Sequence, residues 1–597
     1  MISSLTPGLI FILGGLISFG LRGLFQKLFI LSLPIFAFYQ MSILQSAEPI
    51  SIDFLFSKLS LMRIDNLSYP FALVIILSAL AAFIYGFNLV KQSEYASACI
   101  YIGSALGVIF AGDLITLYIF WELMAVSSSF LVILSGGDRS RKSAIRYLLV
   151  HLVGGLILLA GMILHIHETG STEFISFKIQ NTATWLMLIG ILVNAAAVPL
   201  SSWLSDAYPE STLMGGVILS AVTTKTAIYT LLRAYTGWEE LIWIGVIMAL
   251  FGVIYAFMEN DIRRILSFSI INQGGFMVCA VGIGTPLAIA GGTAHAFCCI
   301  IYTAILWMSA GAVMHRTGKS KCTELGGLYY SMPITFAVAI VGALAIAAAP
   351  FASGFTSKTM ILKALKYNEL FIPWVLLELA SVGVVLHAGL KYIYFVFLGK
   401  DKGIRASDPP ITMIVPMILL SGLTLFIGCF PKAFYEILPY SQYVFKKVPY
   451  TFQSIYFANF ENVITQFQLL SLSVLAFFVF FKYIKVSNTI SIDFDWLYRR
   501  LLRFIYIFLI AFIDFIYNFI NNVCMSFIHR LASFFRQSVP FLLYLVNVPY
   551  LRISNIKINK FQLMNDYSKN IEKQAYPFSI IGSFVFILFI IIFVVVS

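Results

Sequence analysis

Charged residues are scarce in this 597-residue chain: Asp, Glu, Lys and Arg make up 11% of it, while hydrophobic residues make up 60%. Soluble globular domains carry about 25% charged residues and about 45–50% apolar ones. The composition therefore excludes a soluble protein and indicates many membrane-spanning helices. The net charge of +12 does not indicate nucleic-acid binding, because Lys and Arg gather in short loops between apolar segments, where they set the orientation of membrane helices.

Cysteine pairs and cofactor motifs are also missing. The seven cysteines form no CxxC pair, so the sequence predicts neither a disulfide framework nor a metal site. It contains no GxGxxG after a strand and no phosphate-binding loop, and we therefore expect no cofactor and no redox chemistry in the chain itself. The first residues lead into an apolar segment without a signal-peptide cleavage site, which predicts a retained first helix.

Mostly apolar segments long enough to cross a bilayer are abundant. They predict an all-α polytopic membrane protein with a core of fourteen transmembrane helices. The segments lie at 6–21, 25–45, 70–92, 96–112, 113–135, 144–168, 183–205, 212–236, 239–258, 262–283, 286–312, 331–366, 371–398 and 409–430. Basic residues gather in alternate loops, among them the 138–146 loop. By the positive-inside rule, this alternation predicts an external N-terminus and a cytoplasmic 138–146 loop.

Two of these segments are interrupted in the middle, one at Pro199 and the other at Pro350. A proline inside a helix frees backbone carbonyls, which need protein or water partners within a bilayer. Paired interruptions are typical of transporters built from repeats, with the ion sites at the breaks. The predicted domains are N-terminal helices in 1–95, a first five-helix repeat in 96–258, a second repeat in 259–400, a last core helix in 401–430 and a C-terminal extension in 431–597.

Four ionisable residues, Glu122, Lys225, His295 and Lys358, lie inside the predicted spans. A charged side chain at the centre of a membrane costs about 3 kcal/mol or more, so it usually faces the bundle interior or a water path. We interpret the four as a proton relay, with Glu122 and Lys225 on neighbouring helices as a pair. The simpler alternatives are a structural ion pair for Glu122, a lysine that extends to the interface for Lys225, and a hydrogen-bonded core histidine for His295.

Other polar residues in or near the spans are weaker candidates. His387 and Lys391 lie near the end of their span, where Lys391 is expected to extend to the interface. His151 and His165 are assigned to packing or to the interface. The charged cluster at 259–264 is interpreted as a helix cap and an orientation signal rather than as part of an ion path.

The extension after residue 430 has a different character. A polar, aromatic loop at 431–461 precedes a fifteenth span at 464–484 and a long, largely apolar helix at 492–538. Its polar stripe consists of Arg499, Arg503, Asp514, Asn518 and Asn522. Such a helix is expected to lie along a membrane or a protein flank, and a two-span hairpin is the alternative. A last apolar span is predicted at 577–596, so the extension adds about two spans.

Six motifs between residues 90 and 430 resemble, in the same order, those of the antiporter-like membrane subunits shared by Mrp-type multisubunit cation/proton antiporters and respiratory complex I. They read DLITLYIFWELM, VPLSSWLSDAYPE, LSAVTTKTAIYTLLR, NDIRRILSFSIINQGG, HAF…SAGAVMHRTG and PFASGFTSK. The resemblance implies a fourteen-helix core with two broken helices. It also implies that Glu122 works with lysines in a hydrated chain at the membrane midplane, and that Lys225, His295 and Lys358 occupy three further positions of that chain.

The chain departs from this family at four places. Asn194 stands where the family usually has the lysine that partners the glutamate, and Cys299 and Thr303 stand where it commonly has His and Lys. Ser205 replaces the proline of the family's WLPDA motif. The resemblance therefore implies either that Lys225 takes over as the partner of Glu122 or that the first half of the path is impaired.

The resemblance implies a proton-conducting subunit of a multisubunit monovalent cation/proton antiporter in a bacterial cell membrane, with core motifs closer to those of the D-type subunit. One alternative is a pumping subunit of an NADH–quinone oxidoreductase, and the C-terminal extension resembles the distal subunit of complex I. The other alternative is a structural or assembly subunit with a degenerate relay. The expected partners are other membrane subunits, protons, Na+ or K+ and lipid, and not nucleic acid.

Overall fold

The computed structural model describes residues 6–44, 50–54, 57–458, 460–481, 495–553, 565–566 and 569. Eleven of the fourteen predicted segments contain a helix long and apolar enough to cross a membrane, and the other three contain the shorter apolar helices α1, α7 and α14. The chain is an integral membrane protein. Which end of the bundle faces the cytoplasm stays a prediction.

The helices of the core follow the predicted segments closely. They are α1 (Pro7–Ser18), α2 (Gly23–Leu44), α3 (Ser68–Gly86), α4 (Gln92–Phe110), α5 (Leu114–Ile133), α6 (Gly137–Thr169), α7 (Thr182–Asn194), α8 (Ser202–Ala207), α9 (Leu213–Ala221), α10 (Thr223–Ala234), α11 (Glu240–Met258), α12 (Ile262–Ile283), α13 (Pro286–Thr317), α14 (Pro333–Ile346), α15 (Ser353–Tyr367), α16 (Phe371–Val384) and α17 (Ile411–Cys429). Helix α16 continues into two π-helical turns, η4 (Val385–Lys391) and η5 (Tyr394–Leu398). The 3-10 turns η2 (Tyr208–Glu210) and η3 (Cys322–Glu324) lie in loops.

Polar residues at the expected positions start several of these helices. The side chains of Asp113, Thr212 and Asp261 each accept a hydrogen bond from a backbone N–H of the first turn of α5, α9 and α12. Asn181 and Thr184 form a reciprocal capping box at the start of α7. These caps satisfy donors that the first turn of a helix leaves unpaired.

A small antiparallel hairpin, β1 (Ile50–Phe54) and β2 (Ser57–Met62), was not expected from the sequence. The backbone N–H of Ser60 donates to the Asp113 carboxylate at 2.8 Å, and the Ser60 carbonyl accepts from Gly112 at 2.9 Å. The hairpin is thereby fixed to the start of α5.

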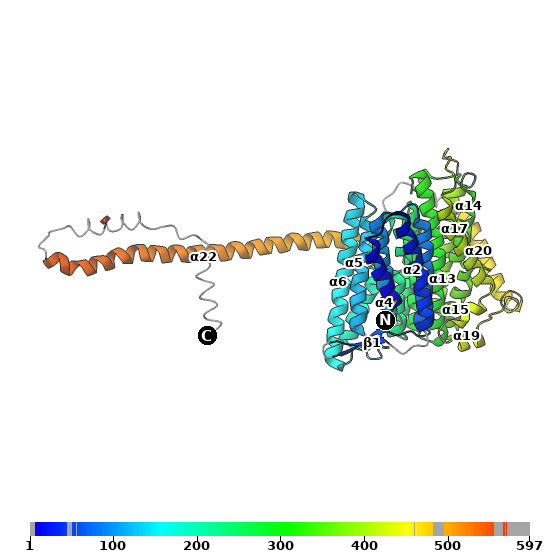
Figure 1. The fold of residues 1–597 in the computed structure, drawn as a ribbon, viewed down its shortest axis with the longest axis horizontal. Coiled ribbons are helices and arrows are strands. Elements are labelled where there is room, and N and C mark those ends of the chain that lie inside the picture. Colours follow the sequence, from blue (N-terminus) through cyan, green and yellow to red (C-terminus); the bar gives the residue numbers. More distant parts are fainter. Residues whose placement is uncertain are drawn as a thin grey trace. The chain divides into compact units, whose positions relative to one another are not determined.

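The interior of the bundle is formed by α9, α10, α12 and α13, whose side chains are almost entirely buried. Helices α4, α5 and α6 run side by side (Figure 1). Helix α6 exposes Leu149, Val153 and Leu156, while His151 and Leu158 on its other face are buried. An exposed apolar face next to a buried one is what a helix in contact with lipid requires, because lipid tails are as apolar as leucine.

Two halves of the core repeat the same backbone contacts. The N–H of Leu114, after Asp113, donates to the Thr172 carbonyl, and the N–H of Ile262, after Asp261, donates to the Ser320 carbonyl. In each case the loop after the following long helix returns to the start of the preceding one. Helix α5 therefore corresponds to α12 and α6 to α13. The exact domain boundaries stay a prediction.

The rest of the described chain is α18 (Lys432–Glu436), α19 (Ser441–Lys447), η6 (Ser454–Ala458), α20 (Phe460–Val479) and α22 (Asp495–Ile553). Helix α20 is the predicted fifteenth span. Helix α22 belongs to a second unit, Trp496–Ser597, and is one continuous helix of 59 residues, so the two-span hairpin is wrong. At about 90 Å it is about three times as long as a bilayer core is thick. Its position along a membrane or a protein flank stays a prediction, and the predicted 577–596 span lies outside the described residues.

Candidate functional site

The first broken helix stops at Asn194. The backbone N–H groups of Ala195, Ala196 and Ala197 donate back to the carbonyls of Ile191, Val193 and Leu192. Ala196 has a φ of 58°, a left-handed conformation that costs an L-residue about 1–2 kcal/mol. This is the geometry that closes a helix end, here adopted by alanine instead of the usual glycine. The chain then unwinds until α8 begins at Ser202.

The second broken helix has the same backbone. Ala347, Ala348 and Ala349 donate to the carbonyls of Ala343, Ala345 and Leu344, and Ala348 has a φ of 56°. The two breaks therefore match residue for residue, with Ala196 equivalent to Ala348. Pro199 and Pro350 are one position out of register in this alignment, because each proline only has to lie in the unwound segment after the helix end.

Different side chains take up the carbonyls that the two breaks free. At the first break the Val193 carbonyl accepts from the indole Nε1 of Trp203 at 2.9 Å. At the second break the Ile346 carbonyl accepts from Nζ of Lys358 at 3.3 Å. The predicted position of Lys358 beside a break, where carbonyls solvate its charge, is therefore what the structure has.

Lys358 is buried, with 1% of its surface exposed. Its Nζ lies 3.4 Å from the Ser381 hydroxyl and 4.8 Å from the centre of the Phe276 ring. The carboxylate of Glu378 on α16 is near enough to interact with it electrostatically. Glu378 was missed in the sequence, although a carboxylate in the middle of the run FIPWVLLELASVGVV is a detectable signal.

His295 lies between the two lysines. Its Nε2 is 3.0 Å from the Gln273 Oε1, and its Nδ1 is 3.1 Å from the Ser357 hydroxyl, one residue before Lys358. The ammonium groups of Lys225 and Lys358 both act electrostatically on the ring. Both ring nitrogens thus have fixed partners, which orients the imidazole between two cations.

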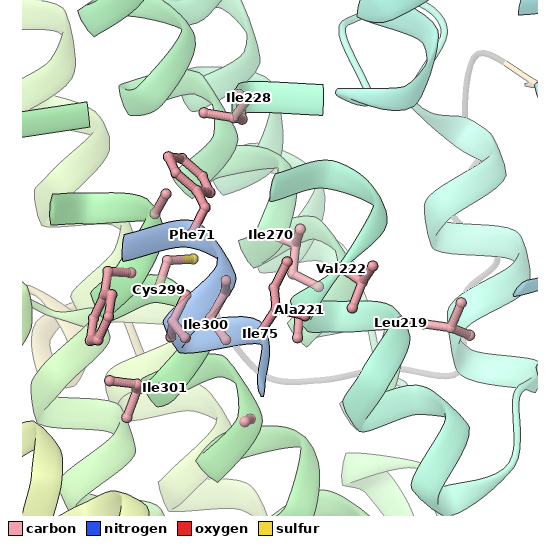
Figure 2. Packing of buried hydrophobic residues seen from close by; sticks show 14 of the residues in the cluster. Phe71, Ile75, Leu219, Ala221, Val222, Ile228, Ile270, Cys299, Ile300 and Ile301 are labelled. Atoms are coloured by element: carbon pink, nitrogen blue, oxygen red, sulfur yellow. The ribbon is translucent and has the colours of Figure 1, made fainter. Parts of the chain in front are cut away.

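Lys225 turns away from the first half of the path. The helix is broken at Val222, between α9 and α10, and Nζ of Lys225 donates to the freed Ser220 carbonyl at 2.7 Å. The same ammonium interacts with the Cys299 thiol of α13. Figure 2 shows Cys299 packed among apolar residues of α3 and α13. Lys225 is 1% exposed, so it does not extend to the interface.

Glu122 is separate from this group. It is half-buried on α5, and its Oε1 has no hydrogen-bond partner within the described structure. The carboxylate fills the space beside Gly155 of α6, where a Cβ would overlap it. Among the described ion pairs none joins Glu122 to Lys225. The predicted pair is therefore absent, because the break at Val222 aims the lysine at the Ser220 carbonyl.

Asn194 and His151 form a contact that the sequence analysis missed. The Asn194 Oδ1 lies 2.8 Å from Nδ1 of His151, and both residues are buried. The imidazole packs against the rings of Tyr147 and Trp203, at centroid distances of 4.2 and 4.5 Å. His151 is therefore part of the first break and not an interfacial residue.

Comparison with known proteins assigns the segment that carries all these residues. Residues 111–385 match a family model described as "NADH:quinone oxidoreductase/Mrp antiporter, TM". Residues 111–385 belong to this antiporter family. The match extends from the cap of α5 to the start of η4 and includes both breaks, Glu122 and Glu378.

Individual relatives are similar over a longer stretch. The A-type component of a Na(+)/H(+) antiporter from Alkalihalophilus pseudofirmus is 30% identical over 422 residues, which are 62% of this chain and 52% of that one. The Mrp complex of Dietzia sp. DQ12-45-1b has a chain with a TM-score of 0.66 at 20% identity, covering 79% of this chain and 99% of that one. A chain of respiratory complex I from Thermus thermophilus also has a TM-score of 0.66, at 21% identity and with 75% and 99% covered. The chain thus spans about half the length of the curated relative it matches, and the solved structures establish the antiporter-like fold.

Lys391 and the 259–264 cluster are structural within this antiporter fold. Nζ of Lys391 donates to the carbonyls of Phe257 and Glu259 at the end of α11, which is a favourable position for a cation. Lys391 is 1% exposed, so the expectation that it extends to the interface is wrong. The cluster is the helix cap that was predicted, because the Asp261 carboxylate accepts from the first turn of α12.

One end of the antiporter domain has an open cavity of about 830 Å³, lined in part by Asp65, Arg233, Tyr440 and Lys446. Two nitrogen–oxygen contacts of 2.8 Å join Arg233 to the Asp65 carboxylate. Burial acts to raise the pKa of Asp65, but the Arg233 guanidinium outweighs it and holds this pKa below its usual value. The carboxylate at the mouth of the cavity is therefore ionised and paired.

Proposed function

We propose that this chain is a proton-conducting subunit of a multisubunit monovalent cation/proton antiporter. One observation carries the proposal: a buried imidazole, His295, is held between Gln273 and Ser357 and lies within electrostatic reach of both Lys225 and Lys358. Charged groups placed this deep in a membrane protein are typical of ion and proton paths. The family of residues 111–385 and the Mrp-like fold support the same function.

The arrangement suits a relay in which each charge controls the next. A neutral imidazole binds a proton at one ring nitrogen and releases one from the other, and the partners of His295 hold it in position for this exchange. A proton added at Lys358 disfavours protonation of His295, and so does one added at Lys225. Protonation at one end of the group therefore drives the proton away from the next site. Glu378 is the counter-charge that stabilises the protonated Lys358.

A second candidate function follows from the first break. Glu122 has no cation among the described ion pairs, and Asn194 stands at the helix end where the resemblance implies a lysine. A structural or assembly subunit whose relay has degenerated would have this pattern. A pumping subunit of an NADH–quinone oxidoreductase is the third possibility. Co-purification distinguishes them: small antiporter subunits support the first proposal, and flavin or iron–sulfur subunits support the third.

The partners and the exchanged cation are also proposals. We expect neighbouring membrane subunits, protons and Na+ or K+, in a bacterial cell membrane with the N-terminus external. The closer likeness to a D-type subunit stays a prediction. Arg139 and Arg146 pair with Glu210 and Asp206, which brings two loops that were both assigned to the cytoplasmic side to the same end of the bundle.

The test is Lys358→Ala in everted membrane vesicles from cells that express the chain with its neighbouring genes. We expect proton exchange on addition of Na+ or K+ to fall to background, since general acid–base groups contribute about 100-fold or more. The matched control is Lys366→Ala, which removes an exposed lysine from the same helix. Exchange at the parent rate in Lys358→Ala would contradict the proposal, and so would a parent chain that exchanges no cation.

A further inference from the structure

The first break contains a histidine whose second nitrogen is free. His151 is 1% exposed, its Nδ1 is engaged by Asn194, and its Nε2 has no hydrogen-bond partner within the described structure. Buried polar atoms without a partner are rare in folded proteins and cost about 1–3 kcal/mol each. A site that leaves one unpaired at the end of a broken helix is suited to a group that exchanges protons with water or with a neighbouring acid.

Glu122 is the neighbouring acid. Its unpaired Oε1 occupies the place of a side chain at Gly155 of α6. Gly155 and His151 are four residues apart and share the inward face of that helix, about 6 Å apart along its axis. The missing side chain at position 155 therefore brings a carboxylate from α5 onto the face of α6 that carries the free imidazole nitrogen.

The hydrogen bond to Asn194 allows His151 to change its charge without moving. The amide Oδ1 accepts from Nδ1–H in the neutral ring and in the imidazolium alike, so a proton can bind or leave at Nε2 while the other bond stays in place. Two ring contacts, with Tyr147 and Trp203, hold the imidazole plane. The site thus has a fixed ring, a free nitrogen and an acid one helical turn away.

A polar route continues from this ring toward Lys225. The Tyr147 hydroxyl lies 2.8 Å from the Ser128 hydroxyl and 3.5 Å from the Thr223 hydroxyl, two residues before Lys225. Other buried polar atoms near this break are also without a partner in the described structure: Asn194 Nδ2, Ser201 Oγ, Ser202 Oγ, Tyr208 Oη and Thr224 Oγ1. Polar atoms in such number are typical of a space that holds water.

We propose that His151 is the proton carrier of the first half of the path and exchanges a proton with Glu122. The proton leaves the carboxyl O–H of Glu122 and binds Nε2 of His151, directly or through one water, and returns by the same route or passes on toward Thr223. This rests on the proposed function. The groups that face His151 are Glu122 from α5, Asn194 from α7, Trp203 from α8 and Tyr147 from its own helix, and the Lys225 ammonium is bound to the Ser220 carbonyl.

The transport test compares His151→Gln with His165→Gln in the expressed assembly. Glutamine can keep a bond to Asn194 but cannot carry a proton, so we expect cation-driven proton exchange to fall about 100-fold or more. His165→Gln, a half-exposed histidine on the same helix, keeps the parent rate. Because Asn194 touches the ring, Asn194→Lys in the His151→Gln background places a new proton carrier at the same point and restores exchange. A structural role predicts no such rescue. Parent-like exchange in His151→Gln overturns the proposal, and so does failure of the rescue in a double variant that is present at the parent level.

A second measurement does not depend on transport. Infrared spectra of the purified chain, taken between about pH 5 and pH 9, show an imidazole protonation band in the parent that is missing in His151→Gln and kept in His165→Gln. Absence of this difference overturns the proposal even when His151→Gln is inactive. If the parent exchanges no cation, the proposed function fails, while the infrared band still decides whether His151 takes up a proton.

Discussion

The two broken helices have the same backbone and different chemistry. Each ends with three N–H groups bonded back to the same relative carbonyls and with an alanine in the left-handed region, Ala196 or Ala348. At the first break, neutral Trp203 takes the freed carbonyl and His151 binds the last helical residue. At the second break a lysine, Lys358, takes the carbonyl directly. The fold therefore provides the same polar opening twice, and the side chains decide what each opening does.

This difference explains how the chain tolerates asparagine at position 194. A lysine beside a helix break needs carbonyls and a counter-charge, and the second break supplies both, through Ile346 and Glu378. At the first break the carbonyl of Val193 is already occupied by an indole. A histidine with a fixed amide partner does not need that carbonyl. The two halves thus reach a buried protonatable group by separate routes.

The largest difference in stability is expected at two glycines. A Cβ at Gly354 would overlap the backbone carbonyl of Ala345, whereas a Cβ at Gly155 would overlap the far end of the Glu122 side chain. Backbone cannot move aside cheaply, so Gly354→Ala should lower the free energy of unfolding by about 3 kcal/mol and Gly155→Ala by about 1 kcal/mol. Denaturant titration in mixed micelles measures both. Gly422→Ala, with open space around its Cβ, is the control. Equal losses at Gly354 and Gly155 would show that the second break yields as easily as a side chain.

The helices and their breaks could be predicted because their causes are local. A run of apolar residues of sufficient length predicts a span, and Pro199 and Pro350 predict interruptions. The predicted spans agree with the helices to within a few residues at most ends. The hairpin at 50–62 was missed because two short strands beside a membrane segment carry little periodic signal.

The pairing of charges could not be predicted because it depends on where each side chain points. Lys225 follows an unforeseen break at Val222, which rotates it toward Ser220 and Cys299. His151 was assigned to packing because a lone histidine on an apolar helix is usually that. A usable signal existed in the glycine pair at 154–155, since small residues mark where helices and their polar groups come close.

The second prediction concerns the helix starts, where the two repeats should behave alike. Asp113→Ala and Asp261→Ala each remove a cap and one further hydrogen bond, to Ser60 or from Ser320. Each should therefore lower the free energy of unfolding by about 1–2 kcal/mol, with similar values. Asp401→Ala, which breaks an exposed pair with Arg405, should change it by less than about 0.5 kcal/mol. A difference of more than about 2 kcal/mol between the two caps would mean that the repeats differ outside the breaks as well.

The smallest effect is expected for a pair that the sequence suggested and the structure does not contain. In a double-mutant cycle, Glu122→Gln and Lys225→Met should be additive in unfolding free energy within about 0.5 kcal/mol, because the two side chains share no contact. The same cycle with Glu378→Gln and Lys358→Met should give a coupling of about 1 kcal/mol or more, since those charges do interact. A pair buried in this way loses stability when one partner is removed alone, because the other charge is left uncompensated. A coupling above about 1 kcal/mol between Glu122 and Lys225 would restore the lysine as the partner of the glutamate and leave His151 without a role in the first half.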